Sequence, residues 1–342
     1  MLVANPNLCL DRTVRLPELV VGAVHRSREA VVTAGGKGVN VARVLRAHGH
    51  APVVAGLVPS EDGDRLRRLL ADEGAELAGA PVTGAIRVAT VLVEDHGRVT
   101  VVNEPGPWVD AGTWDAYRVL VAERAAASTV LVCTGSLPPG APADGYGQLV
   151  AVGRARGCTV VVDAARSALA GALAAGPDLV TPNLAEAEAM LAAGGSAVGE
   201  VAGRSVDQAT GHSPEHVDET AEDVLARAAA AAEELVAAGA RRAAVTAGAA
   251  GVVLALPTAG GAPAVEVVAV AAPAVHVVNP VGAGDSFVAG VVHGRARGED
   301  WVAAVRRGVA TASTSCEQLR AGGVDVARVG ELLARTAVRS VT

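Results

Sequence analysis

Residues 129–163 read TVLVCTGSLPPGAPADGYGQLVAVGRARGCTVVVD, and this stretch decides the fold class. The apolar, β-branched runs at 129–133 and 158–163 predict two buried strands. Between them, residues 144–156 have the composition and period of a helix. A strand, a helix and a second strand of these lengths form a βαβ unit, which places the two strands parallel in one sheet.

The same alternation extends over most of the chain. Further strands are predicted at 52–58, 178–181, 243–246 and 251–256. Further helices are predicted at 38–48, 62–73, 113–126, 185–193, 219–238, 285–297 and 301–315. The sequence therefore predicts an α/β protein with a mostly parallel sheet, whose ligand site lies beyond the carboxyl ends of the strands.

Three segments, residues 13–33, 86–103 and 194–220, do not follow this alternation of strands and helices. Residues 13–33 and 86–103 resemble strands joined as hairpins, the second with a turn at 96–97, and we expect them to form a small sheet that acts as a lid. Residues 194–220 are polar and predict a loop insertion. His212 and His216 have the spacing of a helical metal pair, but the neighbouring Gly211 and Pro214 favour a loop over a metal site.

Composition restricts the class of protein. Of 342 residues, 51% are hydrophobic but only 2% aromatic, so Ala, Val and Leu must fill the core. The net charge of −7 without a basic block disfavours nucleic-acid binding, and an anionic substrate would need a local group of cations. The apolar tract at 252–278 is interrupted by prolines and predicts two strands, with no membrane partner. Four widely spaced cysteines and an N-terminus without a signal sequence predict free thiols in the cytoplasm.

The strongest local signal is NPVGAGDSFVAGVVHG at 279–294. Its glycines allow backbone N–H groups to approach an anion closely, at the start of a helix whose dipole favours negative charge. Asp285 stands at that helix start. It could simply cap the helix, or it could accept a proton from a hydroxyl that attacks a phosphorus atom. Spacing alone leaves both open.

Four other segments carry chemistry-bearing residues. AGGKGVNVARVLRAHG at 34–49 is a glycine loop leading into a helix, either as a plain turn or as a ligand contact, and it is not a Walker A loop because Gly follows Lys37. TPNLAEAE at 181–188 puts Asn183 and Glu186 on one helical face, which could hold a hydrated Mg²⁺ or simply start the helix. GSLPPGAP at 135–142 and VTAGAAGVV at 245–253 are turns that follow strands.

In this order along the chain, NLCLDRT, GGKGVNVARVL, NEPGP, GSLPPG, PN-x-x-E, VTAG-x-x-G and VGAGDSF resemble the PfkB family of carbohydrate kinases, in the ribokinase-like superfamily. The resemblance covers residues 7–290, and the GGKG, NEPGP and GSLPPG forms are most similar to the branch of 1-phosphofructokinase and tagatose-6-phosphate kinase. It implies a single kinase domain over residues 1–342 with a three-layer α/β/α core. It also implies a β-sheet lid, often a dimer contact, and the use of ATP and Mg²⁺.

The resemblance also implies roles for individual residues. Asp285 matches the catalytic base, and Gly282, Ala283 and Gly284 match the anion hole for the transferred phosphoryl group. The residues that match the substrate site are Asp11, Arg26, Gly35, Gly36, Lys37, Asn40, Arg87 and Ser136, with Arg26, Lys37 and Arg87 facing the substrate's own phosphate. Asn183, Thr246, Gly248 and Gly251 match the nucleotide site, and Glu186 matches a residue that holds Mg²⁺ through water.

The implied reaction is transfer of phosphate from ATP to a phosphohexose, with fructose 1-phosphate giving fructose 1,6-bisphosphate placed first and tagatose 6-phosphate or fructose 6-phosphate as alternatives. A kinase for an uncharged sugar or nucleoside is less favoured, because three cations would lose hydration without an anionic partner. A sugar-phosphate sensor without turnover is the alternative of another class. It is motivated by Thr181, where many relatives carry Lys, and by Pro280, where they carry Thr. A dinucleotide-binding oxidoreductase is disfavoured because no GxGxxG follows the first strand.

Overall fold

The structure of the protein is a computed structural model that describes every residue except 28, 194–218, 259–264 and 342. The predicted insertion at 194–220, with His212 and His216, therefore lies almost entirely outside the described residues. Cys9, Cys133 and Cys158 are buried thiols, and Cys316 is partly exposed. In the part of the chain that is described, no helix combines the length and the apolar character needed to cross a bilayer.

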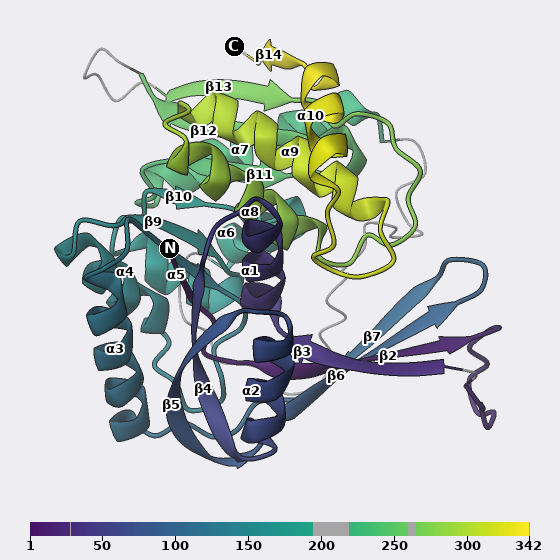
Figure 1. Ribbon diagram of the computed structural model, residues 1–342. Coiled ribbons are helices and arrows are strands. Elements are labelled where there is room, and N and C mark those ends of the chain that lie inside the picture. Colours follow the sequence, from purple (N-terminus) through teal and green to yellow (C-terminus); the bar gives the residue numbers. More distant parts are fainter. Residues whose placement is uncertain (28, 194–218, 259–264, 342) are drawn as a thin grey trace.

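A ten-stranded sheet runs through the body of the molecule, in the order β14-β13-β12-β11-β10-β9-β8-β1-β4-β5 (Figure 1). The seven strands from β5 to β11 are parallel, and the last three are antiparallel. This confirms the predicted α/β class with a mostly parallel sheet. The strands are β1 (Leu2–Ala4), β4 (Val53–Glu61), β5 (Glu76–Ala85), β8 (Val130–Thr134), β9 (Thr159–Asp163), β10 (Leu179–Val180), β11 (Ala243–Thr246), β12 (Val252–Pro257), β13 (Val265–Val270) and β14 (Val338–Ser340).

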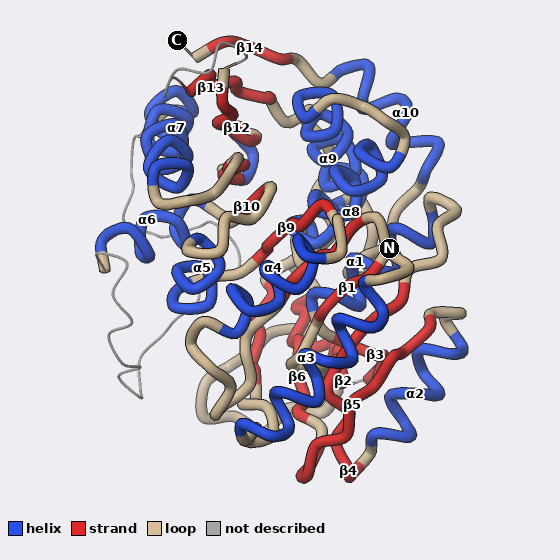
Figure 2. The backbone as a smooth tube through the Cα atoms, turned by 90° about the vertical axis from the view of Figure 1, so that its left-hand side faces the viewer, coloured by secondary structure: helices blue, strands red, loops and turns tan. Residues whose placement is uncertain are grey.

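Helices cover both faces of this sheet and complete three layers (Figure 2). One face packs against α3 (Ala111–Ala125), α4 (Gly145–Ala155), α5 (Arg166–Leu173), α6 (Leu184–Ala192) and α7 (Ala221–Ala237). The other packs against α1 (Lys37–Ala47), α8 (Ala283–Ala296) and α9 (Trp301–Cys316), with α10 (Val326–Arg335) outside α9 and α2 (Gly63–Asp72) beside β4. Both interfaces consist largely of Ala, Val and Leu, as the composition predicted.

A separate four-stranded sheet projects from the body (Figure 1). Its order is β3 (Glu29–Gly35), β2 (Cys9–Leu16), β6 (Arg87–Glu94) and β7 (Val99–Asn103). The two stretches predicted to pair therefore do pair, and Gly97 occupies the turn between β6 and β7 with a φ of 90°. The strand β2 begins at Cys9, earlier than predicted, so the small sheet reaches into the core.

Helices α1 and α8 pack against each other, and their carboxyl-terminal ends bring three histidines together. The ring of His48 stacks on that of His293 with centroids 4.2 Å apart, and His50 Nε2 lies 2.8 Å from His293 Nδ1. The pKa of His48 is lowered to about 4 and that of His293 to about 3, chiefly by burial, and nearby Arg307 contributes to both shifts. The groups that act most strongly on His293 are His48, His50, Arg307 and Arg297, and each of them lowers its pKa. These contacts favour the neutral form of the His293 ring.

This cluster predicts how stability depends on pH. Because His293 is only 8% exposed and its pKa is lowered in the fold, unfolding lets it bind a proton below its ordinary pKa of about 6.5. Its contribution to the free energy of unfolding is lost as the pH falls from that value, by up to about 1.4 kcal/mol per pH unit. We therefore expect the unfolding free energy of His293→Gln to fall less steeply than that of the wild type between pH 6.5 and 5.

Urea unfolding at several pH values measures this difference. Asp285, whose raised pKa acts in the opposite direction, is present in both proteins and cancels in the comparison. His276→Gln, which changes an exposed histidine, should keep the slope of the wild type. Parallel curves for His293→Gln and the wild type would contradict the assignment.

Candidate functional site

The candidate site lies where the parallel strands of the large sheet end. Asn5 and Asn7 follow β1, Ser136 follows β8, Asp163 ends β9 and Thr246 ends β11. The helices α1 and α8 begin at the same edge, since their first turns carry Lys37 and Asp285, which interact electrostatically. The predicted position beyond the carboxyl ends of the strands is therefore where these side chains meet.

Asp285 lies in the first turn of α8 and is 5% exposed. Gly282 caps this helix with a φ of 84°, and the helix start has no side-chain capping bond. Instead, Asp285 Oδ2 accepts a hydrogen bond of 2.8 Å from Asn40 Nδ2 of α1. The pKa of Asp285 is raised to about 7, chiefly by burial; Lys37 and the Asn40 hydrogen bond oppose this rise, and nearby Asp163 adds to it. The side chain of Asp285 therefore does not cap the helix, and its role as a base stays a prediction.

Backbone amides at the start of α8 stand beside this carboxylate. The N–H groups in the first turn of a helix have no partner within the helix and point outward, where an anion can meet them. Ala283 N donates to Pro280 O at 3.2 Å, and Gly284 is exposed with no atom near its missing side chain. Asn279 holds the loop, because its Oδ1 accepts from Val281 N at 3.0 Å and its Nδ2 donates to Leu319 O at 2.8 Å.

Lys37 connects two sides of the site. Its Nζ lies 3.3 Å from Asp163 Oδ2 and 4.0 Å from Glu186 Oε1. The pKa of Lys37 is raised chiefly by Asp163, with Glu186 and Asp285 adding to the effect. The sequence placed Lys37 among the cations for the substrate's own phosphate. Its contacts put it instead beside Glu186, on the side predicted for the metal and the nucleotide.

Asp163 was not among the residues predicted for the site. It is 4% exposed, and its Oδ2 also accepts from Thr134 Oγ1 at 2.9 Å. Thr181 Oγ1 lies 3.5 Å from its Oδ1, so the unusual threonine before Pro182 faces this carboxylate. A signal existed in the sequence: Asp163 is an acidic residue directly after the apolar run CTVVV, at the carboxyl end of a predicted parallel strand.

Glycines at the end of β3 allow a close approach between backbone and side chains. A Cβ atom on Gly35 would lie 2.2 Å from Asp11 Oδ1, and one on Gly36 would lie 2.6 Å from Asn5 Oδ1. Asn5 Oδ1 also accepts from Gly38 N at 3.0 Å, which ties the loop to the end of β1. Burial raises the pKa of Asp11, which accepts a hydrogen bond of 3.3 Å from Cys9 Sγ.

Arg87 and Ser136 meet through Asn7. Arg87 donates from Nη2 and Nε to the carbonyl oxygen of Asn7, at 2.9 and 3.2 Å. Asn7 Nδ2 donates to Ser136 Oγ at 2.9 Å. The buried Oδ1 of Asn7 has no partner among the described residues. Arg87 is also close enough to Asp11 to lower its pKa, so these residues line one region.

Arg26 is not part of this cluster. It lies in the exposed loop between β2 and β3, beyond the pair Arg15 and Glu29 at the outer end of the small sheet. Arg15 lies six positions after Cys9 on this strand, which corresponds to about 20 Å. Within one chain, the three cations that the resemblance assigned to the substrate's own phosphate, Arg26, Lys37 and Arg87, therefore do not meet.

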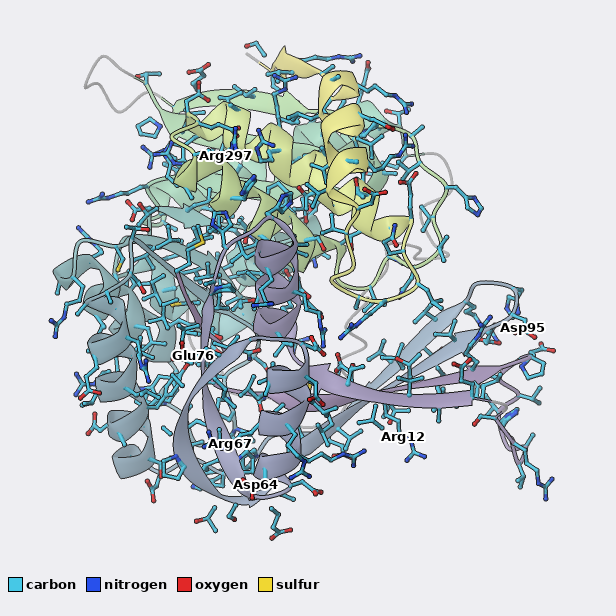
Figure 3. All side chains as sticks on the ribbon, viewed as in Figure 1. Arg12, Asp64, Arg67, Glu76, Asp95 and Arg297 are labelled. Carbon is cyan, nitrogen blue, oxygen red and sulfur yellow. The ribbon has the colours of Figure 1, made fainter. Side chains whose placement is uncertain are left out.

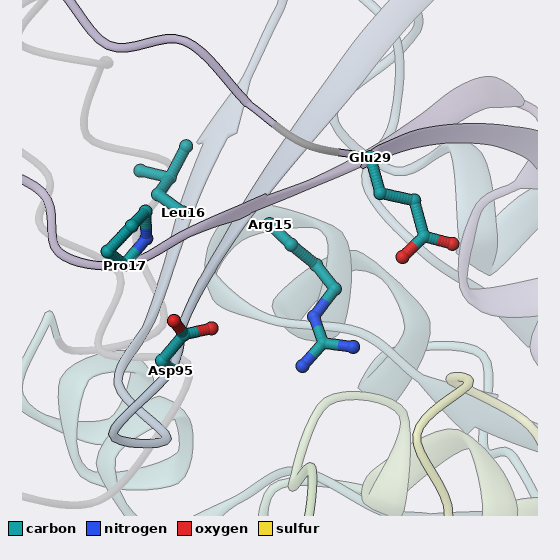
Figure 4. Close-up of a pocket in the computed structure, with 5 residues that line it drawn as sticks. All are labelled: Arg15, Leu16, Pro17, Glu29 and Asp95. Atoms are coloured by element: carbon teal, nitrogen blue, oxygen red, sulfur yellow. The ribbon is translucent and has the colours of Figure 1, made fainter.

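A pocket occurs at this outer end, lined by Arg15, Leu16, Pro17, Glu29 and Asp95 (Figure 4). Figure 3 shows Asp95 at the tip of the small sheet, far from the helices that carry Asp285 and Lys37. The pocket is lined by none of the residues that meet at the sheet edge. We assign it no part in the candidate site.

Asn183 and Glu186 form a capping box at the start of α6. Asn183 Oδ1 accepts from Glu186 N at 2.8 Å, and Glu186 Oε2 accepts from Asn183 N at 3.0 Å. The pair therefore starts the helix, which was one of the two alternatives predicted for it, while Glu186 Oε1 faces Lys37. Thr246 adjoins Asn183 through a β-bridge, and Gly248 and Gly251 form the following turn, Gly248–Ala250 (η1) and its cap, with φ values of 56° and 116°. Their role in binding a nucleotide stays a prediction.

Comparison with known proteins agrees with this arrangement. Residues 5–325 match the family described as pfkB family carbohydrate kinase. The chain is 35% identical over 297 residues to a 1-phosphofructokinase of Rhodobacter capsulatus, which covers 86% of this chain and 83% of that protein. It is 28% identical over 319 residues to a 1-phosphofructokinase of Escherichia coli strain K12, covering 93% and 91%.

Solved structures show the same fold. Phosphofructokinase-2 of Escherichia coli in complex with potassium superposes with a TM-score of 0.80 at 25% identity, over 98% of both chains. A ribokinase of Thermotoga maritima superposes with a TM-score of 0.71 at 18% identity, over 97% of this chain and 98% of that one. The predicted ribokinase-like architecture is therefore confirmed.

Proposed function

The chain belongs to the pfkB family of carbohydrate kinases, and from this premise we propose that it phosphorylates a hydroxyl of a phosphohexose with ATP. We place fructose 1-phosphate first as the acceptor, with fructose 1,6-bisphosphate as the product. The proposal is supported by the name shared by the relatives in Rhodobacter capsulatus and Escherichia coli, at 35% and 28% identity. Tagatose 6-phosphate and fructose 6-phosphate are the alternative acceptors.

One observation carries the proposed reaction: Asp285 lies buried at the start of α8 beside backbone amides, with Lys37 opposite. A general base works best when its pKa is close to the working pH, and burial brings that of Asp285 to about 7. In the proposed step, a carboxylate oxygen of Asp285 takes the proton of the acceptor hydroxyl. That hydroxyl oxygen forms a bond to the γ-phosphorus of ATP while the bond to the leaving ADP oxygen breaks.

The chain's own groups would stabilise the charge that develops in this step. The amides of Gly282 and Gly284 at the start of α8 would donate to the oxygens of the transferred phosphoryl group, whereas the predicted third donor, Ala283 N, already donates to Pro280 O at 3.2 Å. Lys37 would offset the negative charge that Asp163, Glu186 and the phosphates concentrate at the sheet edge. Positioning and charge neutralisation are the main requirements of phosphoryl transfer, so this set of groups suits it.

The residues present also suit Mg²⁺. Asp163 and Glu186 both lie within 4.0 Å of Lys37 Nζ, so two carboxylates with hard oxygen donors face one region. Mg²⁺ prefers one or two carboxylates together with phosphate oxygens and water. These two residues would hold the ion, and it would supply charge neutralisation on the phosphates of ATP.

The preference for a phosphorylated acceptor rests on fewer cations than the sequence predicted. Arg26 lies at the far end of the small sheet, and Lys37 is paired with carboxylates. Arg87 remains beside Asp11, where the sugar hydroxyls are expected. We therefore assign Arg87 to the acceptor's own phosphate, with Asp11, Asn40, Gly35, Gly36 and Ser136 around the sugar.

The proposed function is tested by incubating the purified protein with ATP and each member of a panel of acceptors, and by measuring the release of ADP. We expect turnover with fructose 1-phosphate at a kcat/KM at least about tenfold above that with fructose, ribose or a nucleoside. Turnover confined to uncharged acceptors would replace the proposal by the sugar or nucleoside kinase. Binding of a sugar phosphate without ADP release would replace it by the sensor.

Arg87→Ala should separate the two substrates. Because Arg87 is assigned to the phosphate of the acceptor, its loss should raise KM for the phosphosugar by about tenfold to a hundredfold, which corresponds to one charge-assisted hydrogen bond. KM for ATP should change by less than about threefold. The control is Arg12→Ala, which removes an exposed arginine of the same sheet (Figure 3). Equal effects on both KM values would remove Arg87 from the acceptor site.

The small sheet suggests how the protein associates. Several valines on it or on its loops are exposed by about half or more, namely Val20, Val21, Val24, Val31 and Val102. Exposed apolar groups of this kind mark interaction surfaces. We propose that the sheet serves as a lid over the site and as the contact of a homodimer, which light scattering of the purified protein would detect.

A further inference from the structure

A buried chain of hydrogen bonds leads from the proposed base back into α1. Asp285 Oδ2 accepts from Asn40 Nδ2 at 2.8 Å, and Asn40 Oδ1 accepts from Arg43 Nη1 at 2.7 Å. Asn40 is 5% exposed. Arg43 lies one helical turn further along α1, so it reaches Asp285 only through the amide of Asn40.

Arg43 is held from several directions. Its Nε donates to Glu73 Oε2 at 2.6 Å and its Nη2 to Glu73 Oε1 at 2.9 Å, which is a bidentate ion pair. Nη2 also donates to the carbonyl oxygen of Ala34, just before the glycine pair 35–36. Glu73 is anchored in turn by Arg320 Nη2 at 2.5 Å. The side chains of Arg43 and Glu73 are only 10% and 17% exposed, so the guanidinium has little freedom to move.

This fixed guanidinium decides which way the amide of Asn40 faces. A guanidinium has hydrogen-bond donors and no acceptor, so the atom that faces Arg43 must be the oxygen of the amide. The NH₂ group of Asn40 must then face Asp285. If the amide turned over, its oxygen would meet the carboxylate, and that contact is favourable only when the carboxyl is protonated.

We propose that Arg43 is a positioning residue of this enzyme, which fixes the amide of Asn40 so that it donates to the base Asp285. The catalytic role of Arg43 rests on the proposed function of Asp285, whereas the hydrogen bonds from Arg43 to Asn40 and from Asn40 to Asp285 are observed directly. A donor that faces the carboxylate favours the ionised form, which is the form that accepts a proton. Arg43 thus acts on the reaction without touching either substrate.

Other groups also shift the pKa of Asp285, so a test of Arg43 must leave these groups unchanged. Lys37 and Asn40 from α1 lower its pKa, while burial, Asp163 from β9 and Asp11 from β2 raise it. Arg43 also acts on Asp11, whose pKa it lowers. Loss of Arg43 would therefore act on Asp285 in opposite directions through the two routes. The weaker donor at Asn40 raises the pKa of Asp285, and an Asp11 that ionises less readily offsets part of that rise.

The competing view is that Arg43 only ties α1 to α2 through Glu73. Such a role predicts a lower melting temperature in a variant and no change in the protonation of Asp285. The positioning role predicts a shift in the pH at which Asp285 titrates. The pH profile therefore separates the two.

The experiment compares Arg43→Met with the wild type by two readouts. The first is the carboxyl ¹³C NMR titration of Asp285, identified by the signal missing in Asp285→Asn. The second is the pH dependence of kcat/KM with the best acceptor of the panel. A hydrogen bond to a charged group corresponds to about one pH unit, so we expect both midpoints to rise by about that amount in Arg43→Met.

Two further variants serve as controls. Arg43→Lys keeps a donor for Asn40, so its midpoint should rise by no more than half as much as that of Arg43→Met. Arg46→Met removes the same charge from the exposed side of the same helix, where Arg46 lies beside Gly74, and should titrate as the wild type does. If Arg43→Met does not fold, Glu73→Gln loosens the same guanidinium from a greater distance and should raise the midpoint by a smaller amount.

An unchanged Asp285 titration in folded Arg43→Met overturns the inference, and so does an equal shift in Arg46→Met. The NMR readout needs no turnover. If no acceptor were phosphorylated by the wild type, the proposed function would fail while the link from Arg43 to Asp285 would still be decided.

Discussion

Asp285→Asn should lower kcat by at least about a hundredfold while both substrates still bind, because a general base contributes about 10²–10⁴-fold. The amide has the size of the carboxylate and its oxygen can still accept from Asn40, so the site should keep its shape. Steady-state kinetics with ATP and the best acceptor of the panel measures the effect, and calorimetry measures binding. A variant that keeps more than about a tenth of kcat would reject the assignment of the base.

The matched control is Asp300→Asn. Asp300 also stands at the start of a helix, where its Oδ1 caps α9 through Ala303 N at 2.8 Å. Asparagine caps helices as well as aspartate does, so this variant should keep full activity. The pair distinguishes a carboxylate needed for chemistry from one needed for a helix start.

The pH profile gives an independent check of the same residue. Since the ionised form is the base and burial raises its pKa to about 7, kcat/KM should rise with pH below about 7 and level off above it. The residual activity of Asp285→Asn should lack this rise. A wild-type profile that is flat from pH 5 to 8 would mean that another group accepts the proton.

Lys37→Met should lower kcat by about 10²–10³-fold, the size expected when a preorganised charge is lost from a transition state. The cation stands between Asp163 and Glu186 and acts electrostatically on Asp285. Without it, Asp163, Glu186 and Asp285 would lose the cation that acts on all three of them. The pKa of Asp285 should also rise, since Lys37 lowers it in the wild type.

This variant tests where Lys37 acts. If Lys37 served only the acceptor's own phosphate, as the sequence suggested, KM for the phosphosugar would rise and kcat would stay the same. A fall in kcat together with a shift of the pH profile to higher pH supports the position beside the base. Lys37→Arg keeps the charge and should recover much of kcat.

The order of strands and helices could be predicted from the sequence because each depends on local pattern. Apolar runs such as CTVVVD and helical periods such as that of residues 38–48 fix local structure by themselves. Strand β5 was missed for a local reason: it contains Pro81 and two glycines, which argue against a strand, but an edge strand tolerates them. Short β1 was missed because three residues carry little periodicity.

Motif order and local periodicity were enough to indicate the family, the parallel sheet and the position of Asp285 at a helix start, because both are properties of the linear chain. Which charges meet depends on the three-dimensional packing. It paired Lys37 with Asp163, placed Arg26 at the far end of the small sheet, and joined Arg43 to Asp285 through Asn40. Such pairings depend on contacts between residues as far apart in the sequence as 40 and 285, and the local periodicity that predicts helices and strands does not record them.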